Sequence, residues 1–378
     1  MLPAARLPSA KAHRFSLADV LPNCVDALQG RRGALSLAPV THAVVLLVDG
    51  LGTTALAPRA GHARTLATRL SIDGPISSIF PTTTAAALAT LTTGVLPGEH
   101  GLVGYTAFDA AHDRVVNQLT GWDADMTADW QRVPTLFETA DAAGLASIAI
   151  GPARYRESGF THAVLRGAEY RPGSSVADRL ERAAEALSGP PALVYVYVPE
   201  LDSASHAHGL ESPNWVSALE ELDAAVAGFL PRIGPTHGML ITADHGVVDV
   251  PHEAQRLVTP ELLEGVRHVA GEPRCLQLHL EPGESPDAHA ERWREAEGAR
   301  AWVATRAEAI DAGWFGPVAP EVMPRIGDVL IAARKRIAYY VDPDDTGRKM
   351  IGQHGSLSPD ELTIPLLKFG AFATDRAR

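Results

Sequence analysis

Residues 43–50 read AVVLLVDG, an unbroken apolar run that ends on an acidic residue and a glycine. The run has the length of a strand, and apolar residues without alternation are typical of a strand covered on both faces of a parallel sheet. Similar runs recur along the chain. They lie at residues 146–150, 193–198 and 239–242, with 329–332 and 364–369 as further candidates.

Helical patterns separate these runs. The clearest begins at Ser212 and Pro213, a typical N-cap and first helical residue, and continues as an apolar stripe at spacings of three and four. Strands that alternate with helices predict an α/β fold with a doubly wound, mostly parallel central sheet and helices on both faces. The stripe consists of Trp215, Leu219, Leu222, Val226 and Phe229.

One stretch differs in composition from this alternation of strands and helices. Residues 251–325 are rich in Pro, Glu, Arg and His and contain breaks such as residues 281–286. Runs that look like core strands follow at residues 328–332 and 364–369. We therefore expect a single catalytic domain over residues 1–378, with residues 251–325 as an inserted cap subdomain.

Composition excludes several classes of partner. The formal net charge is −12, which argues against long nucleic acid or an anionic membrane as the main partner. Cys24 and Cys275 form no CxxC pair, so neither a disulfide framework nor a thiolate metal site is indicated. No apolar run approaches the ~20 residues of a spanning helix, and no secretion signal is visible. The expected location is the cytoplasm.

Acidic residues follow three of the apolar runs. Asp49, Asp202 and Asp244 come at or shortly after the ends of strands, and ligands of an open α/β sheet bind at the carboxyl ends of its strands. One such residue alone is often only a helix N-cap. Histidines accompany them, however: His206 lies four residues after Asp202, and His245 follows Asp244 directly.

A further histidine, His354, lies between glycines in GQHGS. Carboxylate oxygens mixed with imidazole nitrogens suit zinc, with manganese or iron as the next options. Six such residues exceed what one tetrahedral zinc binds, so two divalent ions are expected. The alternative is a surface acidic turn with unrelated core histidines.

Hydroxyl groups run into a helix at residues 80–87, FPTTTAAA. An alanine-rich helix over residues 85–92, ended by Gly94, would present free N–H groups and the positive end of its dipole, which together bind anions such as phosphate. Thr82, Thr83 and Thr84 are therefore candidate nucleophiles. The alternative is that they only cap the helix.

Five motifs now stand in order: VDG at 48–50, FPTTT at 80–84, DSASHAHG at 202–209, ADHG at 243–246 and GQHG at 352–355. Together they resemble the alkaline phosphatase superfamily, most closely its nucleotide pyrophosphatase/phosphodiesterase branch, over residues 42–369. The resemblance implies an alkaline-phosphatase-like fold. It also implies that Asp49, Asp244, His245 and Thr84 hold one ion and that Asp202, His206 and His354 hold the other.

By the same resemblance the nucleophile falls on Thr84, with Thr83 and Thr82 as register alternatives. The chain departs from the family pattern at Ala87. The family has an Asn at this position, three residues after the nucleophile, and that Asn could donate to a phosphate oxygen. His100, in the helix exit, is expected to be structural. A phosphomonoester dianion would need an added arginine, and Arg154 and Arg156 are candidates.

The expected function is a two-metal phosphoric ester hydrolase, a phosphodiesterase or nucleotide pyrophosphatase that forms a phospho-threonine intermediate. The expected partner is a small phosphate ester, with nucleotides among the candidates. Alternatives in the same superfamily are a phosphomonoesterase or a phosphonate hydrolase. Less favoured alternatives are a metal-dependent phosphomutase and a non-catalytic metal-binding protein.

Overall fold

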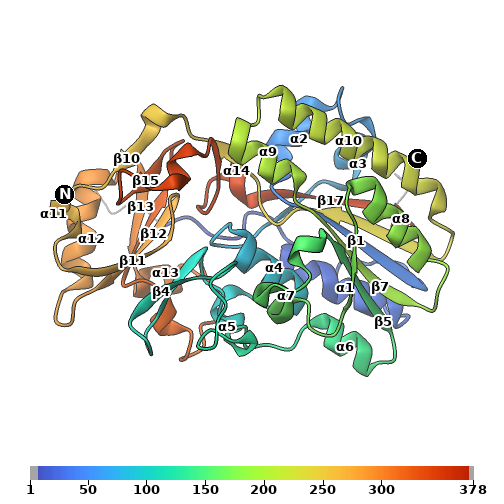
Figure 1. Ribbon diagram of the computed structural model, residues 1–378, viewed down its shortest axis with the longest axis horizontal. Helices are drawn as coiled ribbons and strands as arrows, with labels where there is room; N and C mark the ends of the chain where they lie inside the picture. The colour runs from blue at the N-terminus through green and yellow to red at the C-terminus, as the bar shows by residue number, and fades with distance from the viewer. Residues whose placement is uncertain (1–6, 374–378) are drawn as a thin grey trace.

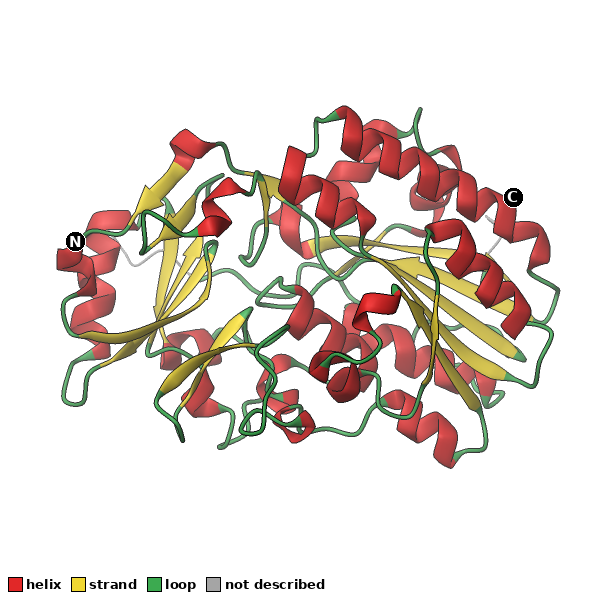
Figure 2. Cartoon of the chain, viewed as in Figure 1, coloured by secondary structure: helices red, strands yellow, loops and turns green. Residues whose placement is uncertain are grey.

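The computed structural model describes residues 7–373, and two β-sheets lie side by side in it, each with its own helices (Figure 1, Figure 2). The central sheet has seven strands within the described residues, in the order β2-β17-β8-β1-β7-β5-β6. Five neighbours from β8 to β6 are parallel, whereas β17 is antiparallel to β8 and β2. The predicted doubly wound, mostly parallel sheet is therefore confirmed. Its strands span Pro75–Ser77 (β2), Thr363–Gly370 (β17), His237–Thr242 (β8), His42–Val48 (β1), Ala192–Val198 (β7), Ala146–Gly151 (β5) and Glu169–Pro172 (β6).

Helices cover both faces of the central sheet, and for this reason the apolar run of β1 does not alternate. Every residue of β1 is buried, and each fully buried Val or Leu side chain contributes roughly 1.5–3 kcal/mol relative to exposure. One face is covered by α1 (Val20–Leu28), α4 (Thr84–Thr93) and α6 (Leu136–Ala142) (Figure 1). The other face is covered by α3 (Arg64–Asp73), α8 (Val176–Ala186), α9 (Glu200–His208) and α10 (Pro213–Phe229).

The long helix α10 begins and packs as its sequence predicts. The Ser212 side chain caps it by accepting a hydrogen bond from the Trp215 N–H at 3.2 Å. Its buried residues are the five of the predicted apolar stripe. The stripe therefore faces the core along the whole helix, which confirms the reading of its spacing.

The second sheet is antiparallel, with six strands in the described part of the chain, and occupies the left half of Figure 2. It packs against α12 (Pro286–Glu297) and α13 (Arg306–Asp311) around buried apolar clusters of its own. In spatial order its strands are Ala301–Thr305 (β13), Val329–Ala333 (β14), Cys275–Leu280 (β12), Val266–Glu272 (β11), Thr106–Asp109 (β3) and Arg114–Asn117 (β4).

The placement of residues 329–332 in the central sheet is wrong, because β14 pairs with β12 and β13 in the second sheet. Residues 251–325 supply β11, β12 and β13, and the second sheet also takes β3, β4 and β14 from outside that range. The division into one catalytic domain with a cap at residues 251–325 stays a prediction. Cys24 and Cys275 are buried free thiols.

A buried ion pair joins the second sheet to the segment that carries His354. Arg274, in the β11–β12 turn, donates from Nε and Nη2 to the two carboxylate oxygens of Glu361 at 2.7 Å each. Glu361 also accepts the Ser356 N–H at 2.9 Å, and its own carbonyl accepts the Gly246 N–H at 2.9 Å. Both ion-pair partners are fully buried, so this joint is tight and its removal is costly.

Short elements complete the chain. Two small two-stranded sheets pair β10 with β15 and β9 with β16. Among the described residues, no helix combines the length and the apolar character that crossing a membrane requires. The short elements are α2 (Thr53–Leu56), α5 (Pro97–His100), α7 (Gly159–Val164), β9 (Val248–Asp249), β10 (Gln255–Leu257), α11 (Pro260–Leu263), β15 (Ala338–Tyr340), β16 (Gly352–Gln353) and α14 (Pro359–Leu362).

Candidate metal centre and cavity

Three carboxylates meet at the carboxyl ends of three adjacent strands, β8, β1 and β7. Asp49 follows β1 directly and Asp244 comes two residues after β8, while Asp202 lies in the first turn of α9 after β7. All three are buried, with Asp244 at 0% exposure. The strand order therefore brings together residues that lie far apart in the sequence.

The first group contains Asp49, Asp244, His245 and Thr84. The Nε2 atom of His245 lies 3.3 Å from Asp244 Oδ2 and 3.6 Å from Asp49 Oδ1. The Thr84 Oγ1 lies 3.2 Å from the same nitrogen. Four side chains with oxygen or nitrogen donors thus converge on one small volume.

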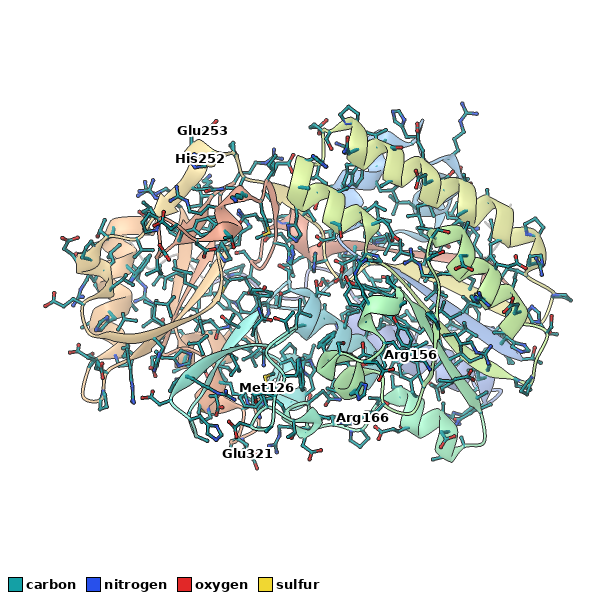
Figure 3. All side chains as sticks on the ribbon, viewed as in Figure 1. Met126, Arg156, Arg166, His252, Glu253 and Glu321 are labelled. Carbon is teal, nitrogen blue, oxygen red and sulfur yellow. The ribbon has the colours of Figure 1, made fainter. Side chains whose placement is uncertain are left out.

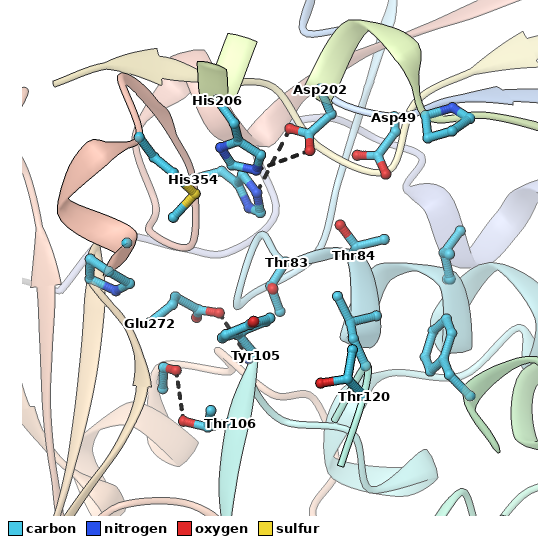
Figure 4. A pocket seen from close by; sticks show the side chains of 18 of the residues that line it. Asp49, Thr83, Thr84, Tyr105, Thr106, Thr120, Asp202, His206, Glu272 and His354 are labelled. Atoms are coloured by element: carbon cyan, nitrogen blue, oxygen red, sulfur yellow. Dashed lines mark hydrogen bonds and ion pairs between the residues drawn. The ribbon is translucent and has the colours of Figure 1, made fainter. Parts of the chain in front are cut away.

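The second group contains Asp202, His206 and His354 (Figure 4). Asp202 and His206 are four residues apart on α9 and share one face of the helix, and their Oδ2 and Nε2 atoms are 3.0 Å apart. The Nε2 of His354 lies 3.9 Å from Asp202 Oδ1. Asp202 also falls within ligand distance of Asp49 and His245, so it stands between the two groups.

All three histidines are held in the tautomer that suits a metal. Nδ1 donates to the Gly352 carbonyl in His206 at 2.6 Å, to the Thr82 carbonyl in His354 at 2.8 Å and to the Gly246 carbonyl in His245 at 3.2 Å. A carbonyl oxygen only accepts, so Nδ1 carries a hydrogen and Nε2 is the ring atom that faces the carboxylates. Each ring therefore presents one free ligand atom.

The buried negative charge of the carboxylates in this cluster requires a positive partner. Among the described residues, Asp49 Oδ1, Asp202 Oδ1 and Asp244 Oδ2 are buried side-chain oxygens without a hydrogen-bond partner. Burial, with the neighbouring Asp244 and Asp202 carboxylates, raises the pKa of Asp49 well above its usual range. Burial opposes a proton on His206, but the Asp202 carboxylate outweighs it and raises the pKa of His206 to about 9.

These unpaired oxygens and free Nε2 atoms fit divalent cations. Burying unpaired carboxylates is expensive, and cations at both groups would supply the missing partners. The mixed oxygen and nitrogen donor set suits zinc, manganese or iron. The identity of the metal and the division of the residues between two ions stay predictions.

The three consecutive threonines at the start of α4 have different surroundings. Thr82 donates to the Ser356 carbonyl at 2.8 Å and accepts the Gly355 N–H at 3.0 Å. Thr83 is the N-cap residue of α4, and Thr84 is its first residue and the one whose hydroxyl reaches His245. Within residues 7–373, the N–H groups of Thr84, Ala85 and Ala86 donate to no acceptor. The start of α4 thus offers open donors beside the Thr84 hydroxyl.

Ala87 lies on α4 three residues after Thr84 and is buried at 0% exposure. An alanine side chain carries no donor, so a donor to a phosphate oxygen near Thr84 has to come from another group. The cavity near Thr84 is lined instead by Tyr105 and Glu272 (Figure 4), which sequence reasoning missed because neither lies in a recognisable motif.

His100 is structural, as expected. It is fully buried, its Nε2 lies 2.9 Å from the Thr90 hydroxyl, and its Nδ1 accepts the Leu102 N–H at 3.1 Å. Burial lowers the pKa of His100 to about 3. The ring is therefore a neutral link between α4 and the loop that carries Tyr105.

A cavity of about 1320 Å³ opens over Thr84 and both groups of ligands, so it is far larger than a phosphate alone requires. Tyrosines form much of one wall, and the hydroxyl of Tyr197 donates to Asp49 Oδ2. Arg154 also lines the cavity and lies over the Tyr155 ring at 4.6 Å. Arg156, labelled in Figure 3, pairs with Glu157 outside the lining.

Fold and sequence together place the chain in the alkaline phosphatase superfamily. A sequence profile described as type I phosphodiesterase / nucleotide pyrophosphatase matches residues 43–357. The chain belongs to this family, and the resemblance read from its motifs is confirmed.

Solved structures show the same fold. Murine ectonucleotide pyrophosphatase/phosphodiesterase 5 is 17% identical, with a TM-score of 0.69 over 87% of this chain and 88% of that one. Phosphonoacetate hydrolase from Sinorhizobium meliloti 1021, solved with phosphonoformate, is 17% identical, with a TM-score of 0.68 over 86% and 89% of the two chains.

A further relative matches only part of the chain. Phosphopentomutase from Methylobacterium radiotolerans is 32% identical over 114 residues, which are 30% of this chain and 27% of that enzyme. The chain thus matches about a quarter of the length of this relative.

Proposed function

We propose that the protein is a two-metal phosphodiesterase that cleaves small phosphate esters through a phospho-threonine on Thr84. The observation that carries this proposal is the position of the Thr84 hydroxyl, 3.2 Å from His245 and at the start of a helix with three open N–H groups. The orphaned carboxylate oxygens around it support the binding of two cations.

Asp49, Asp244, His245 and Thr84 would hold one ion, and Asp202, His206 and His354 the other. When bound, such ions lower the pKa of a hydroxyl and neutralise charge on the attacking and leaving oxygens. Thr84 Oγ1 attacks phosphorus, a new Oγ1–P bond forms, and the ester P–O bond breaks with its electron pair on the leaving oxygen. Water then cleaves the Oγ1–P bond and restores the hydroxyl.

The chain's other residues bind and orient the substrate. The open N–H groups of α4 are placed to bind non-bridging phosphate oxygens, an interaction that strengthens as charge builds in the transition state. Tyr197 holds Asp49 by one oxygen and leaves the other free for a cation. The size of the cavity supports an ester with a sizeable organic group on each side of phosphorus, and its tyrosine wall suits a planar ring.

Nucleotides are candidate substrates. A threonine-to-alanine variant of the murine ectonucleotide pyrophosphatase/phosphodiesterase 5, described as inactive, was solved in complex with AMP and has the same fold as this chain. That observation supports both the threonine nucleophile and the substrate class. Cytoplasmic location and the absence of a long nucleic-acid or membrane partner stay predictions.

A phosphonate or monoester hydrolase is the second candidate. Arg154 lines the cavity, and a guanidinium there suits a second anionic group such as a carboxylate. The likeness to phosphonoacetate hydrolase is consistent with that reading.

Hydrolysis of bis-p-nitrophenyl phosphate beside p-nitrophenyl phosphate tests the proposal. Zinc-loaded wild type should prefer the diester, and both Thr84→Ala and chelation should abolish turnover. Thr93→Ala is the matched control, because the Thr93 hydroxyl binds the Ala89 carbonyl within the same helix. Activity that survives in Thr84→Ala would exclude Thr84 as the nucleophile, and preference for the monoester would exclude the diesterase.

A further inference from the structure

Tyrosine is concentrated at the cavity. The chain has seven tyrosines, and all seven line this cavity. Tyr105 differs from the other six, because it is 40% exposed and they are buried or half-buried. The hydroxyl groups of five of the others also have partners, which are Arg154 for Tyr155, the Pro152 carbonyl for Tyr170, Asp49 for Tyr197, Glu297 for Tyr339 and the Gly347 carbonyl for Tyr340.

The Tyr105 side chain has no partner within residues 7–373. Its hydroxyl makes no hydrogen bond, and its ring contacts no other ring and no cation. The ring also packs against none of the buried apolar clusters. On the opposite wall, by contrast, the Arg154 guanidinium covers the Tyr155 ring at 4.6 Å. The face of the Tyr105 ring is therefore open to a ligand in the cavity.

The main chain of Tyr105 is fixed, although its ring is free. The Tyr105 N–H donates to Glu272 Oε2 at 2.9 Å, and the Tyr105 carbonyl accepts the Gln118 N–H at 2.8 Å. The buried side chain of Gln118 also accepts the N–H groups of Val103 and Gly104 at 2.9 and 3.1 Å. The loop is thus held from two sides, so binding a ligand on the ring costs little ordering of the chain.

Glu272 is the half of this support that comes from the second sheet. It is the last residue of β11 and lies next to Tyr105 in the cavity wall (Figure 4). Its exposure is 6%, and its Oε1 is a buried oxygen without a hydrogen-bond partner in the described chain. A Cβ on Gly355 would lie 2.3 Å from Glu272 Cγ, so this glycine makes room for the side chain. A buried carboxyl with an unpaired oxygen lowers stability, which indicates a role other than packing.

We propose that Tyr105 is a specificity-determining residue whose ring stacks on a planar ring in the organic group of the substrate, and that Glu272 is the positioning residue that holds it there. This inference rests on the proposed function, because it assumes that the phosphorus of the ester lies beside Thr84 in the same cavity. Every aromatic ring has a face that can stack. The selected class is therefore phosphate esters with an aromatic group, in preference to esters with aliphatic groups alone.

The test compares the dissociation constants of phenylphosphonate and methylphosphonate, which share the phosphonate group and differ in the planar ring. Titration calorimetry on the zinc-loaded full chain measures both without turnover. Wild type should bind phenylphosphonate roughly 3- to 10-fold more tightly, the contribution of an aromatic pair. Tyr105→Ala should bring the ratio of the two constants close to unity, and Tyr105→Phe should keep the wild-type ratio.

Variants of Glu272 test the positioning role through the same ratio. Glu272→Ala should lower the ratio, because the Tyr105 main chain loses its acceptor. Glu272→Gln keeps an oxygen that accepts the Tyr105 N–H and should recover the ratio. In the Tyr105→Ala background, Glu272→Ala should have no further effect on it. Leu257→Ala is the matched control, because Leu257 is 47% exposed but does not line the cavity.

Several outcomes would overturn the inference. They are equal affinities of wild type for the two phosphonates, binding of neither, a wild-type ratio in Tyr105→Ala, and a wild-type ratio in Glu272→Ala. The proposed function fails separately. Wild type without diester turnover, or Thr84→Ala with full turnover, would overturn that function whatever the phosphonate ratio, since the calorimetric measurement does not depend on the nucleophile.

Discussion

The central sheet and the second sheet contribute different things to one cavity. The central half supplies the buried carboxylates and imidazoles at the ends of β1, β7 and β8, together with Thr84 on α4. The second sheet supplies Glu272 from β11 to the cavity wall, and the small β10–β15 sheet supplies Tyr339 and Tyr340. The groups expected to react are thus held by the parallel sheet, whereas part of the surrounding wall depends on an antiparallel sheet joined to it.

The largest effect is expected from a change within the central half. Asp202→Asn removes the carboxylate that lies between the two groups and should lower kcat/KM for a diester roughly 10³-fold or more, since a metal contributes several kcal/mol to the transition state. Metal content, measured by mass spectrometry, should fall in the same variant. His208→Ala is the matched control on α9, because His208 is exposed. Full metal content in Asp202→Asn would contradict the assignment of Asp202 as a ligand.

The next largest effect, on the free energy of unfolding, is expected at the buried ion pair that joins the two halves. Arg274→Met leaves the Glu361 carboxylate buried without its guanidinium, so the free energy of unfolding should fall by about 3–5 kcal/mol in denaturant titrations. Arg232→Met removes the exposed pair with Glu181 and should change that free energy by less than about 1 kcal/mol. Equal losses in the two variants would mean that the halves do not depend on this pair.

A smaller effect on the free energy of unfolding depends on pH. It can be measured at one buried histidine in each half of the molecule. Burial lowers the pKa of His100 to about 3 and that of His279 to about 4, from an ordinary value of 6.5. The unfolded chain therefore binds these protons first, so the stability that depends on neutral imidazoles is complete above pH ~6.5 and is lost as pH falls toward the folded values.

Replacing His100 should make the chain less sensitive to acid. The stability advantage of wild type over His100→Gln should shrink by about 1 kcal/mol between pH 7 and pH 5.5 in urea titrations, and His279→Gln should behave similarly. His62→Gln, at an exposed position, is the control for the loss of a histidine outside the core. A constant difference between wild type and His100→Gln would show that His100 does not stay neutral in the folded chain.

The elements that the sequence predicted correctly are those whose buried residues form a regular pattern along the chain. The run before Asp49 belongs to a strand covered on both faces, and the α10 stripe has the spacing of a helix face, so both could be read directly. The same rule misplaced residues 329–332. Every residue of β14 is buried within an antiparallel sheet, so its run looks like that of a parallel strand and carries no sign of its partners.

Residues of the second half that face the cavity had no comparable signal. Glu272 stands in GEPR, which reads as a polar turn, and Tyr105 stands in a glycine-rich loop. Their importance comes from the Tyr105 N–H that binds Glu272 across 167 residues of sequence. Such a contact depends on how the two sheets meet, which periodicity and strand-end rules do not describe.

The three threonines before α4 carry one more consequence. Thr82 binds the Ser356 carbonyl close to His354, Thr83 is the N-cap residue of α4, and the Thr84 hydroxyl lies beside His245. Inserting or deleting one residue between β2 and α4 would shift all three threonines by one position, so that each would lose its present surroundings at the same time. The number of residues in this segment therefore matters to the site as well as the identity of Thr84, because a change of one residue disturbs several contacts at once.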